Sequence, residues 1–436
     1  MAYIYINSFF NYVIMIMNMI ITKLMNNLGH YSINENTLYD IFYNMIDYEY
    51  TIDGKEGDEG DEEGEEGEEI TIGLLTNEIP PIVYGGVATW IVNFIKMFEG
   101  HKNITVIPIY LAYNDPLPEE CYDKYPNIRV INNDTEIKDK FNGIDVCINN
   151  LWIALDTIIK LKGHYPNLNI ISVCHSLIRM ENITNLGSVY TNNFNQQELI
   201  FQNSDCIVLI SKAEEEYYNT FGYNLFNTKT CVIYNSYTPM FDNEKKNIDY
   251  TSNDLGYIGR HVPRKRPELV IKAVNYLNNK DVKVINMGVD YDKYDNRYWR
   301  ELKEEYKEQL EVIPFSTDKD IKEKYWESVG VNCITGIYEP FGYTICESID
   351  RGIPVIVQNI DGPKEIIDEV KEYIITYDVD WDIDKDIINF SEAVDKIWKL
   401  TPEERKENCI KARRCLDKLR PEAIRDEWCK LIKSMI

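Results

Sequence analysis

Apolar positions from residue 70 to the C-terminus follow two alternating patterns. Short runs rich in Ile, Val and Tyr alternate with stretches of helical periodicity, which is typical of parallel strands joined by crossover helices. A polar stretch without periodicity, residues 242–253, divides this alternation and predicts a domain linker. The expected strands are residues 70–76, 104–111, 145–148, 169–174, 206–210 and 230–234 before the linker, and 255–259, 282–286, 331–335 and 354–357 after it. The expected helices include residues 87–98, 212–219, 267–277, 343–351, 362–370, 387–400 and 421–436. We therefore predict an α/β fold with two Rossmann-like, doubly wound domains facing a cleft.

The chain before residue 70 predicts an N-terminal extension of different character. Residues 3–22 contain no Lys or Arg and would span about 30 Å as a helix, which matches a bilayer core. Three asparagines within them favour a poorly ordered or interfacial tail instead, so weak membrane association through residues 3–22 stays an alternative. Residues 53–69 hold eleven acidic residues against one lysine and predict a linker, because such a run cannot form a core.

These boundaries predict four parts. Residues 1–69 are the extension, residues 70–240 the first Rossmann-like domain, residues 241–420 the second, and residues 421–436 a helix that packs back on the first domain.

The charge and the cysteines narrow the possible partners and the compartment. A formal charge of −26 repels phosphate backbones, which excludes nucleic acid as a general partner and requires any phosphate site to be local. The ten cysteines form no C-x-x-C pair and no metal-ligand spacing, so we expect reduced, mostly buried thiols, no metal site and a cytoplasmic setting.

Two loops at predicted strand ends are suited to bind phosphate. Gly85 and Gly86 precede a predicted helix, where glycines let the backbone approach a ligand and the helix N-terminus favours an anion. The segment 259–267 carries four basic residues within seven positions, Arg260, Arg264, Lys265 and Arg266. In so acidic a protein this basic group predicts the local phosphate site.

The most specific segment is residues 336–347, in which Glu339 and Glu347 stand eight positions apart around a Pro-Phe-Gly turn. The turn leads from a strand into a helix, so the backbone amides near Gly342 could face a diphosphate. The two carboxylates could then accept hydrogen bonds from sugar and ribose hydroxyls.

This segment resembles the Glu-x7-Glu motif of the retaining family 4 glycosyltransferases, the glycogen-synthase-like group 1 enzymes. The Arg260 to Lys265 spacing, the early Pro-Pro and Gly-Gly loop, Asp205 with Ser211, and Asn235 after a strand are similar to that family too. The resemblance runs from about residue 70 to the C-terminus and implies the two-domain GT-B fold. Ser236 departs from it, because the family often has Asn-Gly where this chain has Asn235-Ser236.

The resemblance also implies roles for individual residues and a nucleotide-sugar donor. Arg260 and Lys265 would hold the donor diphosphate, Glu347 the ribose, and Glu339 the transferred sugar. His175, at a strand end, fits the family histidine that faces that sugar. The remaining donor-binding residues would be Gly85, Gly86, Phe341, Gly342, Tyr343 and Thr344.

By the same resemblance the enzyme would need no metal and no further cofactor, and it would retain the configuration of the sugar. The acidic segment 378–384 looks like a D-x-D metal motif but is better interpreted as a solvated loop. The acceptor, a glycan, a lipid or a small molecule, is not readable from the sequence. Two alternatives stay open: a donor-binding scaffold, and an epimerase or phosphorylase that acts on nucleotide sugars with the same fold.

Overall fold

The computed structural model describes residues 69–436 except 83–84, 113–116, 186–193, 241–247, 289–296, 315 and 317. These residues belong to one compact unit, Gly67–Ile436. The expected membrane-associated tail, residues 3–22, and nearly all of the acidic linker lie outside the described residues.

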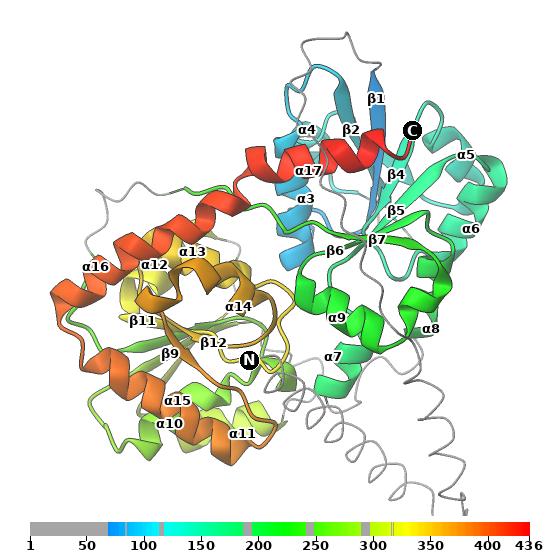
Figure 1. Cartoon of the computed structure of the whole chain (residues 1–436). Coiled ribbons are helices and arrows are strands. Elements are labelled where there is room, and N and C mark those ends of the chain that lie inside the picture. The colour runs from blue at the N-terminus through cyan, green and yellow to red at the C-terminus, as the bar shows by residue number, and fades with distance from the viewer. Residues whose placement is uncertain are drawn as a thin grey trace, which may run out of the picture. The chain divides into compact units, whose positions relative to one another are not determined.

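The N-terminal part of this unit is a seven-stranded parallel sheet in the order β3-β2-β1-β4-β5-β6-β7. Its strands are β1 (Ile70–Thr76), β2 (Ile104–Leu111), β3 (Arg129–Ile131), β4 (Val146–Asn149), β5 (Asn169–Cys174), β6 (Cys206–Leu209) and β7 (Lys229–Val232). Its helices are α3 (Gly86–Met97), α4 (Glu119–Lys124), α5 (Ile137–Lys140), α6 (Leu155–His164), α7 (Ile178–Thr184), α8 (Phe194–Gln202) and α9 (Lys212–Thr220). Figure 1 shows α3 on one side of this sheet and α5 and α6 on the other.

The C-terminal part is a six-stranded parallel sheet in the order β10-β9-β8-β11-β12-β13. Its strands are β8 (Leu255–Ile258), β9 (Val284–Gly288), β10 (Leu310–Pro314), β11 (Val331–Cys333), β12 (Val355–Gln358) and β13 (Ile375–Tyr377). Its helices are α10 (Glu268–Tyr276), α11 (Arg297–Glu305), α12 (Lys319–Ser328), α13 (Tyr343–Arg351), α14 (Asp361–Ile367), α15 (Ile383–Trp398) and α16 (Pro402–Ala412), and α17 (Pro421–Lys433) ends the chain.

Two parallel sheets covered by helices confirm the predicted fold class. In both sheets the strand order reverses next to the first strand, at β1 and β4 and at β8 and β11. Ligands of doubly wound sheets bind beside such reversals, at the carboxyl ends of the strands. The domain limits near residues 240 and 420 stay predictions.

Alternating strand residues build a core on each face of the first sheet. Ile72, Leu74 and Ile148 pack with helix α3 in one cluster, while Leu75 and Cys147 pack with α5 and α6 in another. Successive side chains of a strand point to opposite faces, so a strand buried on both faces must be apolar at nearly every position. This explains why the inner strands are readable as continuous apolar runs.

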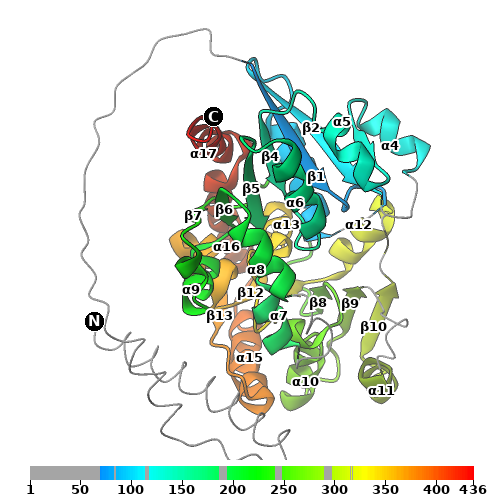
Figure 2. The same cartoon turned by 90° about the vertical axis from the view of Figure 1, so that its right-hand side faces the viewer.

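The last helix returns to the first sheet. Trp428 of α17 makes edge contacts with Phe94 and Trp90 of α3, at 5.1 Å and 6.0 Å between ring centroids. The Trp428 side chain is almost completely buried. Figure 2, viewed from a second direction, shows α17 beside the strands of the first sheet rather than those of the second.

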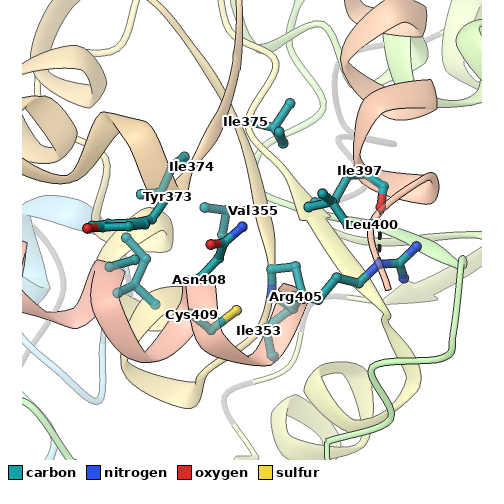
Figure 3. Close-up of a pocket in the computed structure, with 13 residues that line it drawn as sticks. Ile353, Val355, Tyr373, Ile374, Ile375, Ile397, Leu400, Arg405, Asn408 and Cys409 are labelled. Atoms are coloured by element: carbon teal, nitrogen blue, oxygen red, sulfur yellow. Dashed lines mark hydrogen bonds between the residues drawn. The ribbon is translucent and has the colours of Figure 1, made fainter. Parts of the chain in front are cut away.

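A small internal cavity of about 20 Å³ lies among α16, β12 and the residues before β13 (Figure 3). Its lining is mostly apolar, with Val355, Ile375 and Cys409 beside the aliphatic part of Arg405. A volume of this size holds about one water molecule, so we interpret it as a packing defect rather than a ligand site. Among the residues that the structure describes, no helix is both long and apolar enough to cross a bilayer.

Candidate active site

Two loops of the second sheet meet at the carboxyl ends of the neighbouring strands β8 and β11. The loop after β8 contains a short 3-10 turn, η3 (Pro263–Lys265), and the loop after β11 contains Glu339. Lys265 and Glu339 form an ion pair across the two loops, with side chains 18% and 14% exposed. The structure therefore brings together two of the residues that the sequence predicts for the site.

Backbone contacts fix these two loops on each other. The Thr335 hydroxyl donates to the Lys265 carbonyl at 2.8 Å, and the Ile337 amide donates to the Arg264 carbonyl at 2.8 Å. These two hydrogen bonds, together with the ion pair between the side chains, set the position of the Lys265 ammonium relative to the Glu339 carboxylate.

Positive charge dominates around the Glu339 carboxylate. Burial alone would raise its pKa, but the charges of Lys265, Arg264 and Arg260 outweigh burial and hold the pKa below its usual value. Burial lowers the pKa of Lys265 to about 8, although the Glu339 carboxylate opposes this shift. Arg260 is exposed, directly after β8, and its charge also acts on Glu78 from the other sheet.

The four basic residues of segment 259–267, which the sequence groups into one phosphate site, lie in different environments in the structure. Arg264 is buried and pairs with Glu181 at 3.1 Å. Arg266 is buried and pairs with Asp386 of α15, while also donating to the backbone carbonyls of residues 380 and 381. Both guanidinium groups are therefore buried by contacts with other parts of the chain, whereas Arg260 is exposed and Lys265 is partly exposed beside Glu339.

The Pro-Phe-Gly turn delivers the chain into helix α13 as predicted. Gly342 caps the helix with φ of 108°, a left-handed conformation that favours glycine, and Phe341 is buried. Tyr343 and Thr344 begin the first turn, where the backbone amides of a helix lack intrahelical partners. Glu347 lies one turn further on and is half-buried.

The predicted residues of the first sheet lie at its carboxyl edge. Gly85 and Gly86 are exposed at the N-terminus of α3, with open space where a side chain would be. His175 follows β5, and its Nε2 lies 2.8 Å from Oδ1 of Asn150, which follows β4. The His175 ring also packs edge-on against Trp90 at 5.1 Å. Burial lowers the pKa of His175 to about 3, so its imidazole is neutral at physiological pH.

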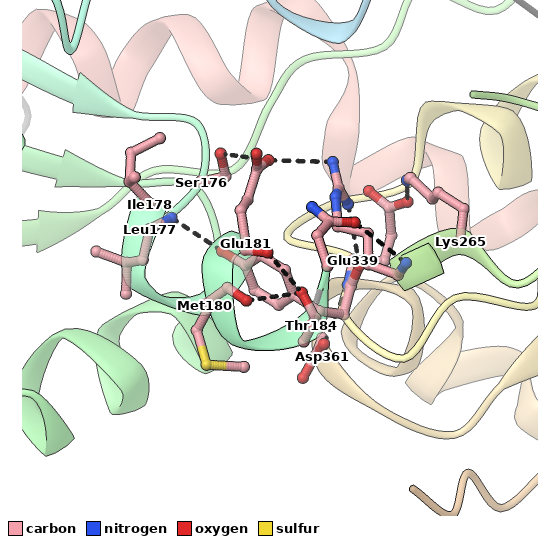
Figure 4. A network of polar contacts seen from close by, with 12 residues as sticks. Ser176, Leu177, Ile178, Met180, Glu181, Thr184, Lys265, Glu339 and Asp361 are labelled. Atoms are coloured by element: carbon pink, nitrogen blue, oxygen red, sulfur yellow. Dashed lines mark hydrogen bonds and ion pairs between the residues drawn. The ribbon is translucent and has the colours of Figure 1, made fainter. Parts of the chain in front are cut away.

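One contact joins the two edges. The backbone amide of Leu177, two residues after His175, donates to the hydroxyl of Tyr338 at 2.9 Å (Figure 4). Since Tyr338 immediately precedes Glu339, the loop that carries His175 and the loop that carries Glu339 touch.

Four residues of this region were not predicted from the sequence: Glu181, Glu214, Tyr338 and Asp361. Glu181 and Glu214 lie in short helices, where a buried carboxylate looks like any surface acid. Asp361 has a left-handed φ of 52°, and its carboxylate accepts from the Glu339 amide at 3.1 Å. The sequence Asp-Gly-Pro after a predicted strand could have indicated that Asp361 lies in a turn at the strand end, near the site.

The acidic segment near residue 380 has structural roles. Asp382 caps α15 by accepting from the Asp384 amide, and Asp380 accepts from the Asp382 amide at 2.8 Å. Within the described ranges, no three His, Cys, Asp or Glu side chains are grouped closely enough to hold a metal ion.

Comparison with known families identifies the second sheet and its helices. Residues 240–414 match the family described as "Glycosyl transferases group 1". The matched segment includes strands β8 to β13 and helices α10 to α16. It contains Arg260, Lys265, Glu339 and Glu347, whereas His175 and the two glycines lie outside it.

Curated relatives match parts of the chain. A glycogen synthase of Thermotoga maritima is 28% identical over 119 residues, which are 27% of this chain and 23% of that protein. An uncharacterized glycosyltransferase of Methanocaldococcus jannaschii is 25% identical over 252 residues, which are 51% of this chain and 63% of that protein. The chain thus spans less than two thirds of the length of the curated relatives that it matches.

Solved structures extend the likeness of fold beyond residues 240–414. Sucrose-phosphate synthase from Thermosynechococcus elongatus superposes with a TM-score of 0.67 at 17% identity, over 84% of this chain and 99% of that one. HepE of Anabaena, in complex with UDP and glucose, gives 0.64 at 14% identity, over 84% and 100%. Both sheets of this chain therefore form the two-domain GT-B fold.

Proposed function

We propose that this protein is a retaining glycosyltransferase that moves a sugar from a nucleotide-diphosphate-sugar donor to an acceptor. The observation that carries the proposal is the Lys265–Glu339 pair beside Arg260, at the N-terminus of α13. A protein of net charge −26 has concentrated cations at one strand edge, where a doubly wound sheet binds ligands.

The cations and the helix N-terminus suit the donor diphosphate. Arg260 and Lys265 would bind its oxygens and stabilise the charge that develops when the bond to the sugar breaks. Backbone amides from Phe341 to Thr344 would add neutral donors, since α13 begins at Tyr343 and its first turn has amides to offer. Gly85 and Gly86, exposed at the N-terminus of α3, would approach the phosphate from the other sheet.

Three further side chains would bind the sugar and the ribose. Glu339 would accept from hydroxyls of the transferred sugar, and its low pKa keeps it an acceptor at neutral pH. Glu347 would accept from the ribose hydroxyls. His175 would face the sugar as a neutral imidazole, which can donate and accept but adds no positive charge beside the anomeric carbon.

The reaction course follows from the resemblance to the retaining group 1 enzymes. The acceptor hydroxyl would attack the face from which the diphosphate leaves, and its proton would pass to the departing phosphate oxygen. The bond from the anomeric carbon to phosphate breaks as the bond to the acceptor oxygen forms, so nucleoside diphosphate and glycoside are the products. Glu339 acts by positioning, and no metal is required.

Two other candidates share the fold, a donor-binding scaffold and an epimerase or phosphorylase that acts on nucleotide sugars. The partly buried Lys265–Glu339 pair fits each of these candidates, because all of them bind a nucleotide sugar, so release of nucleoside diphosphate is what separates a transferase from a scaffold. An epimerase would consume the donor without releasing nucleoside diphosphate. The acceptor and the setting, cytoplasmic or membrane-associated through residues 3–22, stay predictions.

The test follows release of nucleoside diphosphate from UDP-, ADP- and GDP-sugars by the purified full chain. UDP-glucose comes first, because HepE was solved with it. Arg260→Ala and Glu347→Ala are compared with Arg414→Ala, a matched arginine that is 62% exposed and outside the candidate site.

Release from one donor that falls at least 100-fold in both site variants, and stays within twofold in Arg414→Ala and with chelator, would support the proposal. Donor binding without release of nucleoside diphosphate would favour the scaffold. Conversion of the donor's sugar into another sugar, without release of nucleoside diphosphate, would favour the epimerase. Loss of release with chelator would contradict metal independence.

A further inference from the structure

The loop that carries Glu339, residues 336–342, is called the donor loop below. It has no regular structure between β11 and α13. Its position must therefore come from contacts with its surroundings, and the strongest of these come from helices of the first sheet. Three polar anchors surround the loop, each formed by a side chain that is buried or partly buried.

The first anchor is the Tyr338 hydroxyl. Tyr338 is fully buried and accepts from the Leu177 amide at 2.9 Å, beside the Glu214 carboxyl of α9. Glu214 is also fully buried and accepts from the same Leu177 amide at 3.2 Å. A residue of the donor loop is thus enclosed by two residues of the first sheet's helices and loops.

The second anchor is Arg264, which belongs to the loop after β8 but reaches across to α7. Its guanidinium donates to Glu181 at 3.1 Å and to the Tyr338 carbonyl at 3.1 Å. The Glu181 carboxylate also accepts from the Ser176 hydroxyl at 3.0 Å. The two terminal nitrogens of one planar guanidinium therefore hold a first-sheet helix and the donor loop at once, in a fixed fork that the single nitrogen of lysine does not offer.

The third anchor is Asp361 at the start of α14. Its carboxylate accepts from the Tyr217 hydroxyl of α9 at 2.8 Å and from the Glu339 amide at 3.1 Å. Asp361 keeps a left-handed backbone in order to make these bonds. The amide of Glu339 itself is thereby tied, through one carboxylate, to a helix of the other sheet.

We propose that Tyr338, Arg264 and Asp361 are positioning residues through which helices α7 and α9 set the Glu339 carboxylate for the donor sugar. None of the three is assigned to contact the donor. The inference rests on the proposed function, and it divides the site in two: the diphosphate depends on Arg260 and Lys265, and the sugar depends on the anchors.

The test compares Tyr338→Phe with Tyr325→Phe in the full chain. Tyr325 is equally buried and donates to Asn332 at 2.8 Å, but it lies within the second sheet, away from the anchors. Each change removes one buried hydroxyl, so both variants should lose stability for the same reason. A difference in ligand binding between them then reports on the position of the hydroxyl.

We expect Tyr338→Phe to weaken nucleotide-sugar binding by about fivefold to tenfold and to leave binding of the free nucleoside diphosphate within about twofold. Tyr325→Phe should leave the ratio of the two affinities unchanged. Equal weakening of both ligands in Tyr338→Phe, or the same ratio change in Tyr325→Phe, would overturn the inference while leaving the transferase proposal intact.

A second measurement needs no donor. Hydrogen exchange in the ligand-free chain should become faster at the amides of Leu177 and Glu339 in Tyr338→Phe, by about fivefold or more, and not in Tyr325→Phe. Unchanged exchange at both amides would overturn the inference even if every nucleotide sugar failed to bind.

If Tyr338→Phe does not fold, the same comparison is made with Arg264→Lys, and Arg266→Lys serves as its control. Lysine keeps the charge but replaces the two separate donor nitrogens with one, which weakens the link between Glu181 and the Tyr338 carbonyl. Only Arg264→Lys should therefore change the ratio of nucleotide-sugar to nucleoside diphosphate affinity. An equal ratio in both variants would contradict the role of Arg264.

Discussion

Lys265 shows how the environment of one side chain sets a pH range for the proposed reaction. Its pKa of about 8 results from burial, with the Glu339 carboxylate opposing the shift. Above this pH the ammonium loses its proton and can no longer attract a diphosphate. Below it the charge is present.

We therefore predict that the KM for the donor rises between pH 8 and 9.5, approaching tenfold per pH unit. The measurement is the donor KM across pH 6.5 to 9.5. Lys265→Arg should remove the rise, because arginine stays charged throughout this range. A KM that is flat to pH 9.5 in the unmodified protein would contradict a role for Lys265 in binding the donor.

The basic segment 259–267 also shows what residue types alone cannot tell. Arg260, Arg264, Lys265 and Arg266 are alike in charge, and only the family resemblance singles out Arg260 and Lys265. The partners of Arg264 and Arg266, Glu181 and Asp386, lie 83 and 120 positions away. Periodicity and motif spacing carry no information on such distant pairs, so the burial and the partners of Arg264 and Arg266 could not be predicted.

At the scale of elements, the close approach of α14 to the donor loop depends on Gly362. A Cβ at this position would lie 2.3 Å from the Pro340 carbonyl oxygen and 2.6 Å from the Phe341 Cα. Backbone atoms cannot move aside as a flexible side chain does, so Gly362→Ala must displace the loop or the helix.

We predict that Gly362→Ala lowers the free energy of unfolding by about 1–3 kcal/mol and weakens donor binding as well. Gly163→Ala is the control, because Gly163 of α6 has no atom within 4 Å of a Cβ and alanine favours a helix. Denaturant unfolding and donor KM measure the two effects. Equal stability of the two variants would show that the contact between α14 and the loop is not tight.

The ion pair between Arg266 and Asp386 joins the loop after β8 to helix α15. Asp386 is fully buried, and Arg266 is 8% exposed. Removal of one partner would leave the other charge buried without compensation, so Asp386→Ala should cost about 3–5 kcal/mol in the free energy of unfolding.

Asp384→Ala provides the comparison for Asp386→Ala, since Asp384 is exposed in the first turn of the same helix. We expect it to cost about 1 kcal/mol or less. Denaturant unfolding measures the stability of both variants. Similar losses in the free energy of unfolding would mean that the buried ion pair contributes no more than a surface acid.

All interior strands were predicted, and of the four edge strands only β7 was. The ten predicted strands all exist, and the bounds of β1, β2, β5 and α13 agree with the predictions to the residue. The three unpredicted strands, β3, β10 and β13, are all at sheet edges. An edge strand is covered on fewer sides and can be short, so β3 and β13 with three residues each leave no apolar run to recognise.

At the scale of the whole molecule, α17 joins the end of the chain to the first sheet. Trp428 fills the contact with Trp90, and Trp90 in turn packs against His175. We predict that Trp428→Ala lowers the free energy of unfolding by about 3–5 kcal/mol, because a large buried ring leaves a cavity.

Denaturant unfolding measures this loss, and Trp428→Phe should recover more than half of it because most of the apolar contact is kept. A loss below about 1 kcal/mol for Trp428→Ala would indicate that α17 lies only loosely on α3.

The packing of α17 on the first sheet also determines where two related chains can be joined to make a chimaera. The chain runs through the first sheet and then the second, and its last helix packs on the first sheet again. A chimaera with a single crossover near residue 240 would combine the Trp90 surface of one parent with the last helix of another. Exchange of the donor half therefore needs two crossovers, the second just before Pro421, so that each parent keeps its own helix.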